Sequence, residues 1–98
     1  MIILSRSEEK LKIVEDMIHT ISPDVSVRVI PTDLRDKNSY GRVREVIQDQ
    51  DVSVVVNNAG QALFRPFFLS DPAELHSEMC LNLRPITLIT GYARKNFL

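Results

Sequence analysis

The chain has 98 residues, 44% of them hydrophobic and 26% charged, which limits it to one compact α/β domain. Twelve basic and thirteen acidic residues give a formal net charge of −1, which argues against a dedicated nucleic-acid surface. A single cysteine excludes an internal disulfide and favours a reducing compartment. No apolar run approaches the roughly 20 residues of a membrane span, and no signal-peptide pattern follows Met1. We therefore expect a cytoplasmic protein.

The first third of the chain predicts a strand, a helix and a second strand. Ile2–Leu4 is wholly apolar and predicts a short central strand. Ser5 and, three residues later, Glu8 fit a capping box that starts a helix. The buried face of that helix is expected to hold Leu11, Val14, Ile18 and Ile21. After the stop at residues 22–24, the alternation from Val25 to Ile30 predicts a half-exposed or edge strand.

The middle third predicts another helix and another strand. Residues 31–34 end the second strand, and Asp36 is placed to cap a helix. The inward face of this helix is expected to hold Tyr40, Val43, Val46 and Ile47. Val52–Val56, four valines and one serine, predicts a strand buried on both faces. The order β-α-β-α-β predicts a parallel sheet with right-handed crossovers.

An aromatic loop follows at residues 61–69, with Phe64, Phe67 and Phe68. These three side chains would either line a substrate wall or pack onto the core, and packing onto the core is the more common arrangement. We therefore expect the aromatic side chains of this loop to pack onto the core.

The last third predicts one long helix from Asp71 to about Phe97. Asp71 is a capping residue, proline follows it, and Glu74 completes a capping box. The apolar side of the helix would hold Leu75, Met79, Leu83, Ile86 and Ile89. Pro85 lacks an N–H, so we expect a bend there that releases the carbonyl of Leu81.

The residues that follow the valine run carry the clearest motif, Asn57-Asn58-Ala59-Gly60. In open parallel sheets, ligands bind at the carboxyl ends of the strands. Taken alone, the tetrapeptide is equally compatible with an ordinary polar turn. It resembles the Asn-Asn-Ala-Gly signature of the short-chain dehydrogenase/reductase family. That resemblance implies a partial Rossmann fold, doubly wound, with three parallel strands and helices on both faces.

The resemblance also implies cofactor-binding roles for Ser5, Arg6, Asp33 and Leu34, and for Asn57 to Gly60, which would line the cofactor. Family members that prefer NAD have an acidic residue at the position of Ser5. Here Arg6 follows instead, and a guanidinium pairs well with a ribose 2′-phosphate, which implies NADP(H). The alternative is a surface arginine near a helix start. Asp33 and Leu34 resemble the pair that contacts the adenine ring, although a strand-end aspartate is also common in turns.

Asn82 lies 22 residues after Gly60, in the helix that begins at Asp71. This spacing resembles that of the family's catalytic asparagine, whose neighbourhood holds a water in a proton relay. The resemblance therefore implies a catalytic role for Asn82. The alternative is an asparagine on the polar face of a helix.

Several parts of the family pattern are missing from these residues: the glycine-rich phosphate loop, the catalytic serine and the Tyr-x-x-x-Lys pair. Tyr92 and Lys95 are three residues apart rather than four, so we treat them as a false match. The chain alone is therefore expected not to reduce carbonyls. His19, His76 and Cys80 do not form a metal-ligand pattern, and each is most simply a helix residue.

Together these features predict a central fragment of an NADP(H)-dependent oxidoreductase that acts on a small carbonyl or alcohol substrate. Residues 5–11 resemble the steroid and 3-oxoacyl-CoA reductase branch, which would place the protein on the cytoplasmic face of the endoplasmic reticulum. The alternative is a non-enzymatic Rossmann-like remnant that acts as a binding or assembly module. In the strand order 3-2-1-4, the first and third predicted strands would flank an empty position. Because open strand edges recruit other chains, we expect a homo-oligomer. We expect neither a nucleic-acid partner nor a bound metal.

Overall fold

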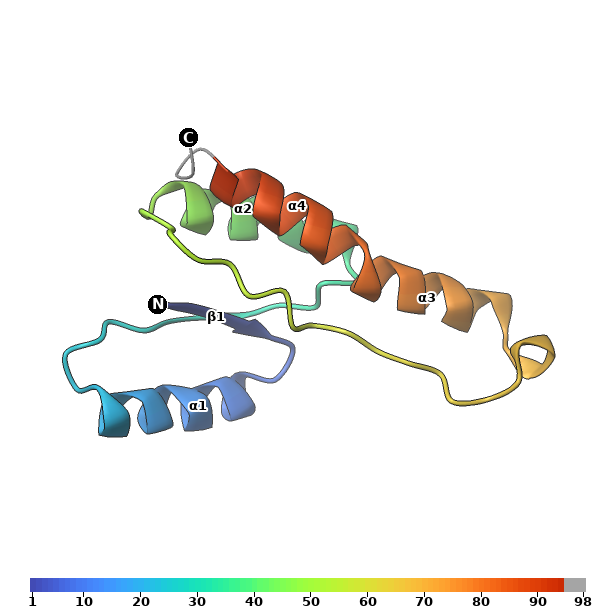
Figure 1. Ribbon diagram of the computed structural model, residues 1–98, viewed down its shortest axis with the longest axis horizontal. Coiled ribbons are helices and arrows are strands. Elements are labelled where there is room, and N and C mark those ends of the chain that lie inside the picture. The colour runs from blue at the N-terminus through green and yellow to red at the C-terminus, as the bar shows by residue number, and fades with distance from the viewer. Residues whose placement is uncertain (95–98) are drawn as a thin grey trace. The chain divides into compact units, whose positions relative to one another are not determined.

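The computed structural model describes residues 1–94 (Figure 1). Its elements, in chain order, are β1 (Ile2–Ser5), α1 (Glu8–Ile21), β2 (Arg28–Pro31), the short 3-10 helix η1 (Lys37–Ser39), α2 (Tyr40–Gln48), the 3-10 helix η2 (Phe67–Leu69), α3 (Pro72–Asn82) and α4 (Arg84–Ala93). The chain forms two compact units, which divide between Asp33 and Leu34. Within the described residues, no helix combines the length and apolarity that crossing a membrane requires.

The first unit is a parallel β-α-β motif. β1 pairs with β2 in a register that sets Ile2 opposite Arg28 and Ser5 opposite Pro31. The ladder continues past the strands, because the Thr32 N–H donates to the Ser5 carbonyl at 2.8 Å. α1 contacts both strands and connects them in sequence. The predicted first strand and its parallel pairing with the second are confirmed, and both strands end at the same edge of the sheet.

The start of α1 differs from the sequence-based prediction. Ser5 is the last residue of β1, so it is not available as the N-cap. Ser7 is the N-cap instead, and its hydroxyl accepts a hydrogen bond from the Lys10 N–H at 3.3 Å. Of the predicted inward face only Leu11 is buried, and Val14 and Ile21 are exposed. A two-stranded sheet is narrower than the apolar stripe of α1, so part of that stripe remains in solvent.

The second strand begins later than the alternation predicts. β2 starts at Arg28 rather than Val25. The Val25 N–H donates to the Ser22 carbonyl at 3.1 Å, which closes a turn and removes Val25 from the ladder. The alternating pattern therefore begins in the turn before the strand and continues into the strand.

The prediction of a third strand at Val52–Val56 is wrong. Among the described residues, the sheet has two strands, β1 and β2. The valine segment has no ladder partner, and Val54 and Val56 are 77% and 81% exposed. β-propensity alone does not make a strand, because the backbone N–H and C=O groups need a neighbouring strand. In the doubly wound order the neighbour of this segment is the strand that separates it from β1, and the described residues form no such strand.

In the second unit, α2 packs against α4. The inward face of α2 is as predicted, and the buried residues are Tyr40, Val43, Val46 and Ile47. Asp36 does act as a cap, but for η1 rather than for α2: its carboxylate accepts from the Asn38 N–H at 2.9 Å. Arg44 of α2 lies over the ring of Tyr92 of α4, 5.9 Å from the ring centre, and adds a cation–π contact to this packing.

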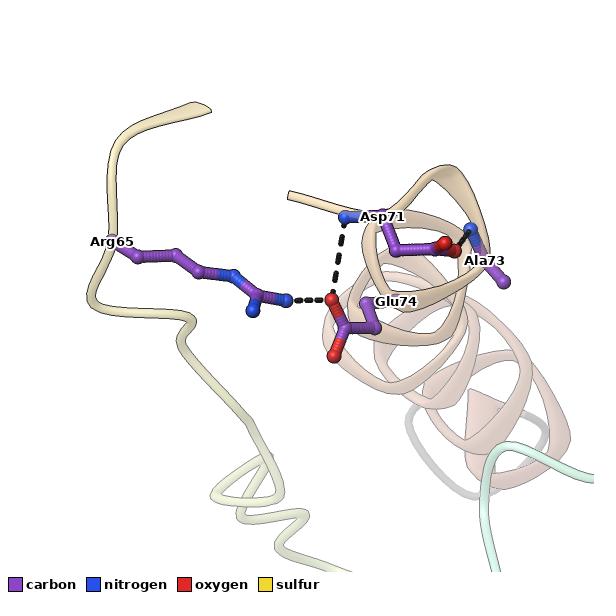
Figure 2. Close-up of polar contacts among 4 residues, drawn as sticks. All are labelled: Arg65, Asp71, Ala73 and Glu74. Atoms are coloured by element: carbon purple, nitrogen blue, oxygen red, sulfur yellow. Dashed lines mark hydrogen bonds and ion pairs between the residues drawn. The ribbon is translucent and has the colours of Figure 1, made fainter. Parts of the chain in front are cut away.

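The predicted capping box at the start of α3 is confirmed (Figure 2). The Asp71 carboxylate accepts from the Ala73 N–H at 2.7 Å, and the Glu74 carboxylate accepts from the Asp71 N–H at 3.3 Å. Arg65 forms an ion pair with the same Glu74 carboxylate. This contact fixes the end of the preceding loop to the first turn of the helix.

The predicted long helix is divided into α3 and α4 (Figure 1). The break is at Leu83, two residues before Pro85, because proline has no N–H to donate to the carbonyl four residues back. The buried residues are Cys80, Pro85 and Ala93, whereas much of the predicted apolar side, Met79, Leu83 and Ile86, is exposed. The predicted end near Phe97 lies outside the described residues.

The expectation that the aromatic loop plugs the core is also wrong. Phe64, Phe67 and Phe68 are 97%, 77% and 83% exposed. They lie around η2, and the ion pair of Arg65 fixes the backbone of the loop without burying its rings.

The contrast between Val43 and Val54 gives a direct test of this fold. Val43 is fully buried between helices, so Val43→Ala should lower the free energy of unfolding by about 1.5–3 kcal/mol. The same change at exposed Val54 should cost less than about 0.5 kcal/mol. Urea denaturation followed by circular dichroism measures both. Equal losses would mean that the valine segment is packed as a strand after all.

Candidate functional site

The carboxyl-terminal edge of the two-stranded sheet holds the first group of predicted site residues. Ser5 ends β1 and lies opposite Pro31, and its carbonyl is taken up by the Thr32 N–H. Arg6 follows directly and is exposed. Within residues 1–94 its guanidinium makes no ion pair or hydrogen bond. Asp33, half-buried, follows β2 at this same edge. Parallel pairing thus brings Ser5, Arg6 and Asp33 to one edge.

Leu34 belongs to the second unit and is part of its core. Its side chain is buried, and its carbonyl accepts a hydrogen bond from the Tyr40 hydroxyl at 2.6 Å. The leucine therefore offers no exposed apolar face in this structure, in contrast to the exposed Arg6.

Asn82 makes the central contact of the second group. Its amide oxygen accepts from the Gln61 N–H at 2.8 Å, and its amide nitrogen donates to the Gln61 carbonyl at 2.7 Å. Only an amide side chain offers a donor and an acceptor with this spacing. The two bonds attach the backbone that follows the Asn-Asn-Ala-Gly segment to the last residue of α3.

Two further contacts hold the segment near the helices. The Asn57 amide nitrogen donates to the Thr90 hydroxyl of α4 at 3.2 Å. At Gly60, an added Cβ would lie 3.4 Å from the Asn82 amide oxygen, which is an ordinary van der Waals contact and shows that the segment lies against this side chain. Asn58 and Ala59 are exposed. The segment is therefore fixed at both ends while its middle residues face solvent.

The structure thus brings Asn82 together with the Asn57–Gly60 segment. The amide of Asn82 makes one donated and one accepted hydrogen bond to Gln61, so its side chain positions the segment. A role in proton relay would fall to backbone groups of the interrupted helix, since Pro85 donates no hydrogen bond to the carbonyl of Leu81.

Sequence reasoning missed three features of the second unit. Gln61 and Thr90 are the partners of Asn82 and Asn57, and no local pattern identifies them, since the pairs are 21 and 33 residues apart. His76 and Cys80 lie in α3, and the missed feature is the contact between their side chains, with Cys80 Sγ 3.4 Å from His76 Nε2. Their four-residue spacing was the available signal. Within residues 1–94, no three His, Cys, Asp or Glu side chains converge as a metal site.

The double hydrogen bond of Asn82 predicts a local effect on the backbone. Asn82→Ala removes the acceptor for the Gln61 N–H, so exchange of that amide hydrogen should be about three- to tenfold faster. Hydrogen exchange measured by NMR at Gln61 tests this. Asn58→Ala is the matched control, since Asn58 is exposed and has no such contact. Unchanged protection in the Asn82 variant would contradict the geometry.

Comparison with known proteins supports the relationship that the motif implies. No family model matches the chain. It is 33% identical over 93 residues to a very-long-chain 3-oxoacyl-CoA reductase of Ajellomyces capsulatus, covering 91% of this chain and 27% of that protein. It is 29% identical over 92 residues to a very-long-chain 3-oxoacyl-CoA reductase-like protein of Arabidopsis thaliana, covering 92% of this chain and 30% of that protein.

A solved structure gives the same picture of the fold. The crystal structure of the bulky-bulky ketone specific alcohol dehydrogenase from Comamonas testosteroni matches with a TM-score of 0.87 and 18% identity, over 98% of this chain and 38% of that one. The chain thus spans about a quarter to a third of the length of the two curated reductases that it matches. It is a distant homologue of the very-long-chain 3-oxoacyl-CoA reductases that it matches.

Proposed function

We propose that this chain is part of an NADP(H)-dependent oxidoreductase and forms the side of the cofactor site that takes the adenosine 2′-phosphate. The observation that carries the proposal is the unpartnered, exposed guanidinium of Arg6 at the carboxyl edge of the parallel β1–β2 pair. The resemblance of the Asn57–Gly60 motif to the short-chain dehydrogenase/reductase signature also implies a nicotinamide cofactor. When bound, this cofactor would supply or accept the hydride exchanged with a carbonyl or alcohol carbon.

The residues at this edge fit a phosphate rather than a bare ribose. A guanidinium presents two parallel N–H donors and binds phosphate in a bidentate manner. Ser5, at the end of β1, carries no charge that would repel a phosphate. An acidic side chain there would instead favour the 2′-hydroxyl of NAD. The combination supports NADP(H) as the cofactor.

In the second unit, the Asn57–Gly60 segment and Asn82 are the residues to which the family resemblance assigns a role. We infer that the exposed middle of the segment lines the cofactor, while the amide of Asn82 holds its end through Gln61. The catalytic role proposed for Asn82 is to place a backbone carbonyl of the interrupted helix where a relay water can bind. The residues of this chain include no positioned general acid such as a Tyr-x-x-x-Lys pair, so the chain alone should not reduce carbonyls.

The relatives are named as 3-oxoacyl-CoA reductases, so we propose a 3-oxoacyl thioester as the substrate class of the whole protein. The 3-oxo group of such a thioester is a ketone, and its carbonyl carbon would accept the hydride.

The charge of Arg6 predicts a specific loss of affinity for a 2′-phosphate. Arg6→Asp removes a charge-assisted hydrogen bond, so affinity for 2′,5′-ADP should fall about ten- to hundredfold. Arg28→Asp is the matched control, because Arg28 is an exposed arginine at the opposite end of the same strand pair. Isothermal titration calorimetry with 2′,5′-ADP and with 5′-AMP separates the phosphate contact from adenosine binding. Equal effects of the two variants, or equal affinity for both nucleotides, would contradict the proposal.

A second candidate function, a non-catalytic assembly module, is favoured by the exposed apolar side chains of the second unit. Within six residues, four large apolar side chains are more than 60% exposed: Phe64, Phe67, Phe68 and Leu69. Apolar clusters of this kind mark interaction surfaces. A chain that assembles but does not bind 2′,5′-ADP would support this function over the first.

The same surface predicts self-association. Sedimentation velocity of the 98-residue chain should show dimers or larger species, and Phe64→Ser with Phe68→Ser should shift the distribution toward monomer. Ile21→Ser, which removes an equally exposed apolar side chain from α1, is the control and should have less effect. A monodisperse monomer of the unaltered chain would exclude homo-oligomerisation.

A further inference from the structure

Three side chains with complementary chemistry line one face of the interrupted helix. His76 and Cys80 lie in α3, and Arg84 is the first residue of α4, at intervals of four residues. Cys80 Sγ is 3.4 Å from His76 Nε2, and the Arg84 Nη2 donates to the same sulfur at 3.2 Å. A thiol thus has a nitrogen base on one side and a fixed positive charge on the other.

The position of the guanidinium is fixed by a second contact. The other terminal nitrogen of Arg84 donates to the Arg35 carbonyl at 3.0 Å. Held by both of its arms, Arg84 is half-buried rather than extended into solvent.

The three residues open onto a shallow pocket of about 600 Å³ in the second unit. Lys37 lines it as a second cation, and Met79 and Leu83 form part of an apolar wall. None of its lining residues is acidic, although the chain as a whole carries a net charge of −1. A pocket with two cations, apolar walls and no carboxylate suits a small anionic ligand.

We propose that Cys80 is a modification site that forms a mixed disulfide with small anionic disulfides bound in this pocket. The pocket supplies charge attraction through Lys37 and Arg84, and the sulfur is its reactive atom. This role is independent of the nucleotide-binding edge at Arg6 and does not require hydride transfer.

The exchange balances without any further reactant. The Cys80 thiol gives its proton to His76 Nε2, and the thiolate attacks one sulfur of the disulfide. A new bond joins Cys80 Sγ to that sulfur as the original sulfur–sulfur bond breaks. The departing thiolate takes the proton from His76, so one small thiol is released for each mixed disulfide formed.

The competing description is a buried, inert thiol. Cys80 is 9% exposed, and a cysteine in purely apolar surroundings reacts slowly. Its surroundings here are polar on two sides and open on the pocket side. The two descriptions predict opposite effects of folding on the rate of reaction.

The single cysteine makes the test direct. The dianionic aromatic disulfide DTNB should react with folded Cys80 about tenfold faster or more than with the same thiol in urea. His76→Gln should slow the reaction of the folded chain about threefold or more by removing the base. His19→Gln, an exposed histidine of α1 with no contact to the thiol, is the matched control and should leave the rate unchanged.

The charge preference is tested with Lys37→Glu. This change should slow the reaction with DTNB but not that with cystamine, a cationic disulfide, whereas Lys10→Glu, which does not line the pocket, should affect neither. A folded-state rate no higher than the rate in urea, or no effect of His76→Gln, overturns the proposal. Equal effects of Lys37→Glu on both disulfides overturn the preference for anions.

Discussion

The pair of hydrogen bonds between the Asn82 amide and the backbone of Gln61 is the contact on which the candidate site residues of the second unit depend. The preceding valine segment has no ladder to hold it, so strand pairing does not position the residues that follow it. The amide of Asn82 replaces that support from the helix side, and Asn57 adds a weaker tie to Thr90. The motif is thus ordered through a side chain, while Asn58 and Ala59 stay exposed and available to a ligand.

The candidate site residues of the first unit depend on parallel pairing instead. Because β1 and β2 run in the same direction, their carboxyl ends meet at one edge, and the residues that follow each strand meet there too. Arg6 is distinctive at this edge because nothing within residues 1–94 pairs with its charge. Structural arginines usually bond to a carboxylate or carbonyl, as Arg84 does with Arg35. An unpartnered guanidinium at a strand end is what recognition of a phosphate requires.

Local patterns predicted the features that depend on nearby residues. The inward face of α2 and the capping box at Asp71 follow from spacing over three or four residues, and both are confirmed. The break before Pro85 follows from the chemistry of one residue, although the helix is interrupted rather than merely bent. Features that depend on distant partners failed or were missed. The strand at Val52–Val56 needs a neighbour, the burial of Phe64 needs a surface to receive it, and the Asn82–Gln61 bond joins residues far apart in sequence.

The central claim is that the carboxyl edge of β1 and β2 receives the 2′-phosphate of NADP(H). The most direct measurement is an NMR titration of the chain with 2′,5′-ADP that maps amide shifts residue by residue. The account predicts the largest shifts at Ser5, Arg6 and Asp33, with little change at Ile2 and Arg28 at the amino end of the same strands. Shifts centred on the amino end, or no saturable shifts in the folded chain, would contradict it.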